Sequence, residues 1–229
     1  MVTGSHNTPS AERVAVVTGG SRGIGREVAG TLARRDYAVV INYLRHQGDA
    51  DTAVEEILAA NGTALTVRAD VADELDVERL FTETTEAFGG VDVVVHAAAG
   101  PVVLGPVADY DLGTFDALQR TNVRGTFVVN RQASRQLRDG GAIINFSSSV
   151  VGLALPTFAA YAASSGAAEA ITPVLARELH ARDITVNTLA PGLKPPGTPA
   201  EIAKLVAFLV SEDGHWVNGQ VIRVDRGIV

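Results

Sequence analysis

Short runs of apolar, often β-branched residues alternate along the chain with longer segments whose apolar residues recur at helical spacing. Several short runs are apolar on both faces, which is typical of parallel strands covered by helices on either side. The runs predict strands at Val14–Val17, Ala38–Asn42, Ala64–Arg68, Val91–His96, Ala142–Phe146, Thr185–Leu189 and Val221–Val224. The longer segments predict helices at Gly25–Arg35, Asp49–Ala60, Glu74–Phe88, Leu112–Leu137, Phe158–His180 and Pro199–Leu209. This alternation predicts an α/β fold with a doubly wound, seven-stranded parallel sheet and helices on both faces.

The length of the chain and the even spread of these elements favour a single domain. At 229 residues the chain suffices for one large α/β domain, and no repeat or linker divides it. We therefore expect the domain to span residues 13–229. The polar segment Met1–Glu12 lacks the apolar core of a signal peptide. We interpret it as a flexible N-terminal arm and expect a cytoplasmic protein.

Composition argues against several classes of function. The net charge of −7 disfavours nucleic acid as a partner, since phosphate binding needs clustered Lys and Arg. The chain has no cysteine, which excludes disulfides, thiolate zinc sites and cysteine nucleophiles. Its five histidines show no metal-ligand spacing, so we expect no metal site. The longest uncharged stretch, Gly140–Ala168, contains Asn145, Pro156 and several serines, so we expect no membrane span.

A glycine-rich turn follows the first predicted strand. Gly19 permits a tight turn, Gly23 lets backbone approach a pyrophosphate, and Gly25 lets the next helix pack on the strand. That helix then presents free N–H groups and the positive end of its dipole to the phosphates. Three glycines alone would fit a structural turn, but the strand before them and the helix after them favour a dinucleotide site in a Rossmann domain. The same turn contributes Ser21, Arg22 and Ile24 to the predicted site.

The spacing Thr18-Gly19-x-x-x-Gly23-x-Gly25 resembles the TGxxxGxG fingerprint of the short-chain dehydrogenase/reductase family. Further motifs of that family recur in order from Arg13 to Val229. The resemblance implies a nicotinamide dinucleotide cofactor and a small-molecule carbonyl or acyl thioester substrate.

The end of the second predicted strand favours NADP(H) over NAD(H). An NAD-selective site places an acidic residue there to bind the ribose 2′-hydroxyl, but here no acid occurs before Asp49. Arg22 and Arg45 stand where NADP-binding members of the family carry arginines that face the 2′-phosphate. As isolated residues, both arginines would also fit a solvated surface.

The resemblance assigns further cofactor contacts. Asp70 and Val71, after the third strand, match the pair that contacts the adenine, although Asp70 alone would also fit a cap for the helix from Glu74. Ala97 keeps the close approach of the fourth strand to the cofactor. Pro191 and Gly192 match the turn that flanks the nicotinamide ring.

The resemblance also assigns a catalytic group. Tyr161 matches the general acid, Ser149 the serine that binds the substrate oxygen, and Asn122 the asparagine of the proton relay. In this family a lysine four residues after the tyrosine lowers its pKa and holds the nicotinamide ribose. Residues i and i+4 of a helix share a face, so both side chains reach one pocket.

The sequence departs from the family pattern at three places. Ser165 occupies the lysine position, and the chain's only lysines are Lys194, which follows the Pro191-Gly192 turn, and Lys204. Alanines follow His96 at the place where the family motif is Asn-Asn-Ala-Gly, and we interpret His96 as a structural residue. Finally, only ten residues separate Gly192 from Ala203, where most relatives carry a longer loop over the substrate. The active site is therefore expected to be atypical.

These observations favour an NADPH-dependent reductase of a ketone or 3-oxoacyl substrate, closest in pattern to the 3-oxoacyl-carrier-protein reductase branch. Two alternatives stay open: a degenerate homologue that binds cofactor as a scaffold or sensor subunit, and a non-redox enzyme that reuses the pocket. Small residues in Phe158–His180 suit close helix contact between subunits. As in the family, we expect a homodimer or homotetramer.

Overall fold

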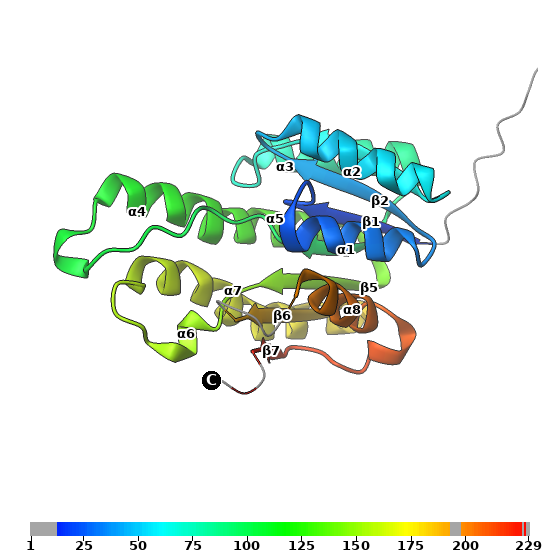
Figure 1. Cartoon of the computed structure of the whole chain (residues 1–229). Coiled ribbons are helices and arrows are strands. Elements are labelled where there is room, and N and C mark those ends of the chain that lie inside the picture. The colour runs from blue at the N-terminus through cyan, green and yellow to red at the C-terminus, as the bar shows by residue number, and fades with distance from the viewer. Residues whose placement is uncertain (1–12, 193–197, 226, 228–229) are drawn as a thin grey trace, which may run out of the picture.

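A seven-stranded parallel sheet forms the centre of the molecule (Figure 1). The computed structural model describes residues 13–192, 198–225 and 227. The predicted arm Met1–Glu12 therefore lies outside the described residues. The strands are β1 (Arg13–Thr18), β2 (Tyr37–Tyr43), β3 (Thr63–Arg68), β4 (Val91–His96), β5 (Leu137–Phe146), β6 (Thr185–Pro191) and β7 (Val221–Val224). They lie in the order β3-β2-β1-β4-β5-β6-β7, which confirms the predicted doubly wound sheet.

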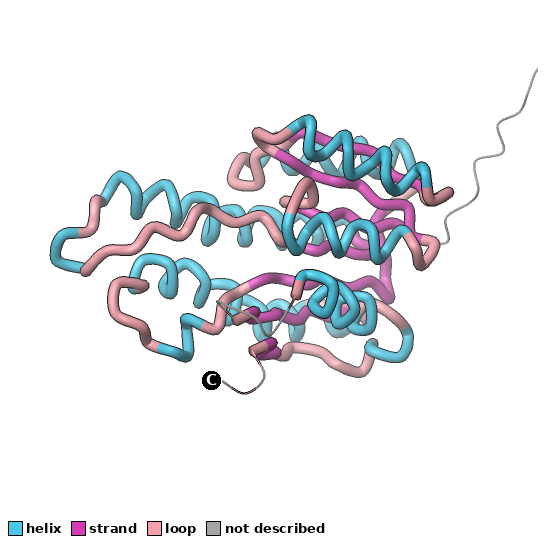
Figure 2. The backbone as a smooth tube through the Cα atoms, in the orientation of Figure 1, coloured by secondary structure: helices cyan, strands magenta, loops and turns pink. Residues whose placement is uncertain are grey.

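Helices cover both faces of the sheet, as Figure 2 shows. They are α1 (Gly23–Ala33), α2 (Gln47–Ala59), α3 (Glu74–Phe88), α4 (Leu112–Gln119), α5 (Gly125–Gln136), α6 (Val150–Leu153), α7 (Ala159–Glu178) and α8 (Pro199–Leu209). Alternate strand residues face the two sides: Val17 packs in a core with α1, α2 and α8, whereas Val16 packs in a second core with α3, α5 and α7. Both cores are almost fully buried, which explains why the strands are apolar on both faces.

Two predicted elements differ from the structure by more than two residues. β5 begins at Leu137 rather than Ala142, because Leu137 pairs with Val91 and Ala142 with Val93, and the polar residues between them lie in a register shift. The predicted helix Leu112–Leu137 is divided by a π-helical turn at Arg120–Arg124. The helical periodicity continues through that turn, so the apolar pattern gives no sign of it.

A row of buried polar side chains crosses five strands near their carboxyl ends. Asn42 of β2, Thr18 of β1, His96 of β4, Asn145 of β5 and Thr188 of β6 are paired in register from strand to strand. None is more than 2% exposed. Burying polar groups in this way is costly unless they are hydrogen-bonded to each other or to the backbone.

Side chains of α5 and α7 hydrogen-bond to two members of this row. The side-chain amides of Asn145 and Asn130 bond to each other at 2.9 and 3.2 Å. Thr172 of α7 bonds Thr188 at 2.6 Å. These contacts tie α5 and α7 to β5 and β6 directly beneath the carboxyl ends of the strands.

Candidate functional site

The glycine turn between β1 and α1 has the shape that a phosphate-binding loop requires. Gly19 has φ +64°, and a Cβ there would lie 2.8 Å from the Ala98 backbone. A Cβ on Gly25 would overlap the Gly19 carbonyl oxygen. Gly23 also has a positive φ, of +57°, but the space beside it is open to 4 Å. Two glycines thus pack backbone on backbone, and the third leaves room for a ligand above the turn.

The start of α1 differs from that of three other helices. Side chains of Asp73, Asp111 and Thr198 cap the N-termini of α3, α4 and α8. At α1 the N-cap residue, Arg22, makes no side-chain cap, and the first turn has no acidic residue. The free N–H groups and the positive end of the α1 dipole are therefore open to an anion.

Two arginines flank this turn. Arg22 and Arg45 are both exposed and follow the ends of β1 and β2, which are neighbours in the sheet. Among the described residues, neither guanidinium has a hydrogen-bond or ion-pair partner. Ser21, in the same turn, is only 5% exposed.

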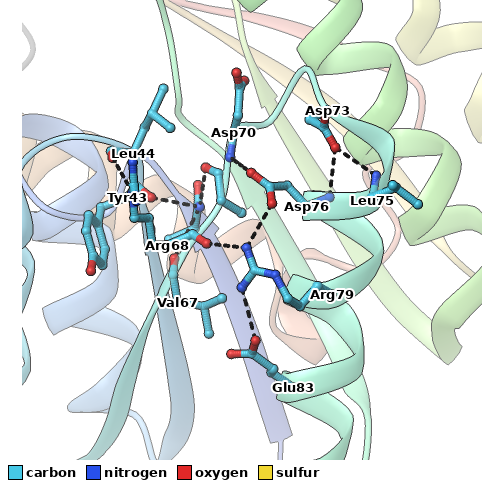
Figure 3. A network of polar contacts seen from close by, with 12 residues as sticks. Tyr43, Leu44, Val67, Arg68, Asp70, Asp73, Leu75, Asp76, Arg79 and Glu83 are labelled. Carbon is cyan, nitrogen blue, oxygen red and sulfur yellow. Dashed lines mark hydrogen bonds and ion pairs between the residues drawn. The ribbon is translucent and has the colours of Figure 1, made fainter.

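Asp70 and Val71 lie between β3 and α3. Asp70 is at the edge of the network in Figure 3. The Asp70 carboxylate accepts from Ala72 N at 2.9 Å and from Arg120 at 2.7 Å. The side chain of Val71 is buried against Gly125 of α5. Asp70 does not cap α3, because the cap is Asp73, which accepts from Leu75 N and Asp76 N.

Arg79 fixes that turn on the α3 side. Its guanidinium donates to the Arg68 carbonyl at 2.7 Å and pairs with Asp76 and Glu83. Asp76 in turn accepts from Asp70 N, and this bond together with Arg79 lowers the pKa of the Asp76 carboxyl. The backbone carrying Asp70 is thus held independently of any ligand (Figure 3).

A cavity of about 280 Å³ opens beside the carboxyl ends of β4, β5 and β6. It brings together six of the residues predicted from the sequence: Ile24, Ala97, Asn122, Tyr161, Pro191 and Gly192. Its other lining residues are Ala98, Ala99, Thr126, Phe146, Ser147, Ser148, Ser164 and Ser165. No described lining residue is ionised at neutral pH, and hydroxyl groups supply most of the polar lining.

Asn122 lies in the π-helical turn that separates α4 from α5. Its amide oxygen accepts from Gly100 N at 2.7 Å, and its amide nitrogen donates to Ser164 Oγ at 2.9 Å. The wider turn displaces one residue from the regular helix and directs this side chain between β4 and α7. Asn122 therefore connects two walls of the cavity.

Tyr161 and Ser165 lie one turn apart on α7, and both line the cavity. Burial raises the pKa of the Tyr161 hydroxyl, and a hydrogen bond with the Ser165 side chain opposes part of that rise. Lys204 is exposed on α8, and Lys194 lies outside the described residues. Ser165 stands at the position where the resemblance implies a lysine, and among the described residues no ammonium group lines the cavity.

The structure brings Ser148, rather than the predicted Ser149, to the cavity. Ser149 is the N-cap of α6 and is 1% exposed, with no hydrogen-bond partner for its hydroxyl among the described residues. Ser147 N bonds Leu189 O and Ser149 N bonds Pro191 O, which fixes the register of the segment against β6. Three successive serines fit the motif at three registers, so spacing alone could not choose between them.

His96 is buried at the end of β4, and the expectation of a structural role fits its contacts. Its Nδ1 lies 2.8 Å from Thr18 Oγ1, which also accepts from Ala98 N. Burial lowers the pKa of the imidazole to about 4. A neutral His96 thus holds the turn that carries the alanines of the cavity wall.

The same geometry occurs in known proteins. The family description "short chain dehydrogenase" matches residues 13–202. The chain belongs to the short-chain dehydrogenase/reductase family. This confirms the resemblance of the glycine turn and of the later motifs, and it places the chain among oxidoreductases.

Individual relatives span nearly the whole chain. An uncharacterized oxidoreductase of Methylorubrum extorquens is 36% identical, with 94% of this chain and 97% of the relative covered. Versicolorin reductase stcU of Emericella nidulans is 34% identical, with coverages of 94% and 95%. A short-chain dehydrogenase of Burkholderia cenocepacia, solved in complex with NADP, is 33% identical with a TM-score of 0.88, covering 95% of this chain and 98% of its own.

Two further features are absent from the described part of the chain. No helix within it is both long and apolar enough to cross a membrane. Nor do three or more of its described His, Asp or Glu side chains gather as the ligands of a metal ion would.

Proposed function

We propose that this protein is an NADPH-dependent reductase of a ketone or 3-oxoacyl substrate. The observation that carries the proposal is the cavity in which Tyr161, Ser148 and Asn122 meet beside the glycine turn. All described lining groups are uncharged, which suits a neutral carbonyl group better than a carboxylate.

The residues present fit the cofactor. The open space at Gly23 and the uncapped start of α1 suit a pyrophosphate. Arg22 and Arg45, unpaired among the described residues, suit the 2′-phosphate that distinguishes NADP(H) from NAD(H). Ile24, Ala97, Pro191 and Gly192 would line the nicotinamide end, and Asp70 and Val71 the adenine end. When bound, NADPH supplies a hydride to the carbonyl carbon.

Tyr161 and Ser148 act on the carbonyl oxygen. Ser148 Oγ accepts weakly from Val150 N at 3.4 Å, and its own hydrogen has no acceptor among the described residues. It is therefore free to donate to the substrate oxygen. Tyr161, whose pKa is raised by burial, is a neutral phenol and donates the proton that the new alkoxide requires.

Reduction is the direction that this site supports best. A neutral tyrosine can give a proton without a neighbouring cation, and Ser165 stabilises the resulting tyrosinate by hydrogen bonding. Oxidation of an alcohol needs tyrosinate from the start, which the missing lysine would otherwise stabilise. The reductase is expected to be slow for its family, since a tuned acid–base group contributes about 10²–10⁴ in rate.

The test combines NADPH binding with turnover. Fluorescence titration gives the Kd of NADPH, and a panel of ketones and 3-oxoacyl thioesters is then assayed for NADPH oxidation. We expect turnover by the wild type and loss of at least about 100-fold in Tyr161→Phe, with an unchanged Kd. Tight binding without turnover of any carbonyl would contradict the proposal.

A cofactor-binding homologue without redox turnover is the second candidate. Ser165 at the lysine position favours it, because the cavity then holds no described cation. Turnover acquired only in Ser165→Lys would identify this case. A changed product formed with NADPH bound and not consumed would instead indicate a non-redox enzyme.

We further propose that the chain forms a homodimer or homotetramer. Phe127 on α5 and Val174 on α7 are 60% and 57% exposed, although both are large and apolar. Covering such side chains in a second copy would remove apolar surface from water. Light scattering after size exclusion tests this, and a monomer at micromolar concentration would contradict it.

A further inference from the structure

A chain of three hydrogen-bonded polar side chains leads from the cavity through α7 to β7. Ser147, a lining residue, donates its hydroxyl hydrogen to Glu169 Oε1 at 2.7 Å. Glu169 in turn accepts from Arg223 of β7 through both carboxylate oxygens, at 2.8 and 3.2 Å. The side chains of Glu169 and Arg223 are 16% and 30% exposed, so the pair is partly shielded from solvent.

This arrangement fixes the direction of the Ser147 hydrogen bond. A hydroxyl has one hydrogen and two acceptor positions, whereas a carboxylate paired with an arginine can only accept. The single hydrogen of Ser147 is therefore committed to Glu169. Toward the cavity, Ser147 offers an acceptor and nothing else.

The Ser148 hydroxyl has the opposite hydrogen-bonding role. It accepts from Val150 N, and its hydrogen has no acceptor among the described residues, so it offers a donor. Both serines line the same cavity. Its wall therefore includes one hydroxyl that can donate and one that can only accept.

We propose that this pair selects carbonyl substrates that carry a hydroxyl donor close to the reacting carbonyl, as α- and β-hydroxy ketones do. The inference rests on the proposed reductase function, in which Ser148 donates to the carbonyl oxygen. Ser147 then accepts from the neighbouring hydroxyl. Glu169 is a positioning residue, because it acts only by holding the Ser147 hydrogen.

Glu169 is well placed for that role. It lies eight residues after Tyr161 and four after Ser165, on the same face of α7. Arg223 neutralises it from the neighbouring strand. A protein that only needed to fill this position could use an apolar residue, since a buried ion pair adds little stability over well-packed apolar side chains.

The experiment compares α-hydroxyacetophenone with α-methoxyacetophenone, which keeps the oxygen but lacks the donor. We measure kcat/KM with NADPH, and the Kd of each ketone for the enzyme–NADPH complex, in wild type, Ser147→Ala, Glu169→Gln and the control Glu178→Gln. Glu178 is an exposed acidic residue at the end of α7, and its carboxylate has no partner among the described residues. The Kd of NADPH is measured for each variant.

Wild type and Glu178→Gln are expected to prefer the hydroxy ketone by about tenfold, the value of one well-formed hydrogen bond. Ser147→Ala is expected to abolish the preference by weakening the hydroxy ketone alone. Glu169→Gln is expected to do the same, because its amide can donate to Ser147 and release the serine hydrogen. A purely structural role would weaken both ketones equally.

Equal losses for both ketones, or a weaker Kd for NADPH in Ser147→Ala, would overturn the inference, since the acceptor would then serve the scaffold or the cofactor. An unchanged ratio in Ser147→Ala would also overturn it. If the ketones bind without being reduced, the reductase function fails, and the ratio of their Kd values still decides the role of Ser147.

Discussion

The two ends of the predicted ligand site, the glycine turn and the cavity that Tyr161 lines, use different kinds of contact. At the glycine turn, contacts come from backbone: the N–H groups of α1 and the close packing of Gly19 and Gly25. At the cavity, where the carbonyl group of the substrate is proposed to bind (the carbonyl end), the contacts come from side chains at the end of β5, on α7 and in the π-helical turn. The first end keeps the family fingerprint, while the second has Ser165 where the resemblance to the family implies a lysine.

The difference shows which part of the site tolerates substitution. The glycine turn needs glycine wherever backbone packs on backbone, so a single added Cβ damages it and few other residues can replace glycine there. A side-chain site can exchange a lysine for a serine while the walls stay in place, because Asn122, Asn130 and Asn145 hold them through other bonds. Substitutions at both ends and in the strand between them test this contrast.

The largest effect is expected from Gly25→Ala. The added Cβ would overlap the Gly19 carbonyl, which no side-chain movement can relieve. Overpacking of this kind costs up to about 3 kcal/mol, so we expect NADPH binding to weaken by about 100-fold in titration. Gly48→Ala is the control, since a Cβ there meets nothing within 4 Å. Unchanged affinity in Gly25→Ala would refute the backbone account.

His96 should make stability depend on pH. The pKa of its imidazole is about 4 in the folded chain, against an ordinary value of 6.5 that applies once the chain unfolds. Between these two values the unfolded chain therefore binds a proton that the folded chain does not. The contribution of His96 to stability is intact above pH 6.5 and is lost as pH falls toward 4, by about 3 kcal/mol in all.

Urea unfolding across this range measures the effect. His96→Asn should flatten the pH dependence, whereas a variant of the exposed His46, His46→Asn, should retain it. Parallel profiles for wild type and His96→Asn would contradict the buried, neutral imidazole.

Ser165→Lys should return the missing cation to the carbonyl end. Ser165 is 6% exposed but borders the cavity, which gives the longer side chain a direction in which to extend. A cation near Tyr161 lowers its pKa by about 1–3 units. We expect alcohol oxidation at pH 7 to rise about 10- to 100-fold, with its pH profile shifted to lower pH. A gain without that shift would argue against an effect on Tyr161.

The smallest effect concerns the choice of cofactor. Replacing Arg45 by Ala removes a guanidinium that has no described partner, so the fold should be unaffected. We expect the preference for NADPH over NADH to fall by about tenfold in kcat/KM, mainly through weaker binding of NADPH. Arg34→Ala, on the exposed end of α1, is the control. Equal losses with both cofactors would assign Arg45 another role.

Much of this architecture could be predicted from the sequence, because buried parallel strands leave an unmistakable apolar signal. All seven predicted strands are present, including the short Val221–Val224. The glycine turn was also predictable, since its constraints are local. In contrast, the π-helical turn that contains Asn122 could not be predicted, because the helical spacing of apolar residues continues through it.

The carbonyl end was less predictable because its contacts are long-range. Nothing in the local sequence relates Glu169 to Arg223, 54 residues away, or identifies Ser147 as the third member of their chain. The choice of Ser148 over Ser149 depends on the register between β5 and β6. His96 was recognised as structural, but its partner Thr18 lies 78 residues earlier.

The N-terminus of α8 has a consequence for how such proteins diversify. Thr198 and Glu201 form a reciprocal capping box and Pro199 stands in the first turn, so the helix starts on signals of its own. Whatever joins Gly192 to Thr198 need not help to start it. The start of α8 is thus set by residues 198–201 alone, so a loop of different length or composition inserted before Thr198 should leave the helix and its packing unchanged.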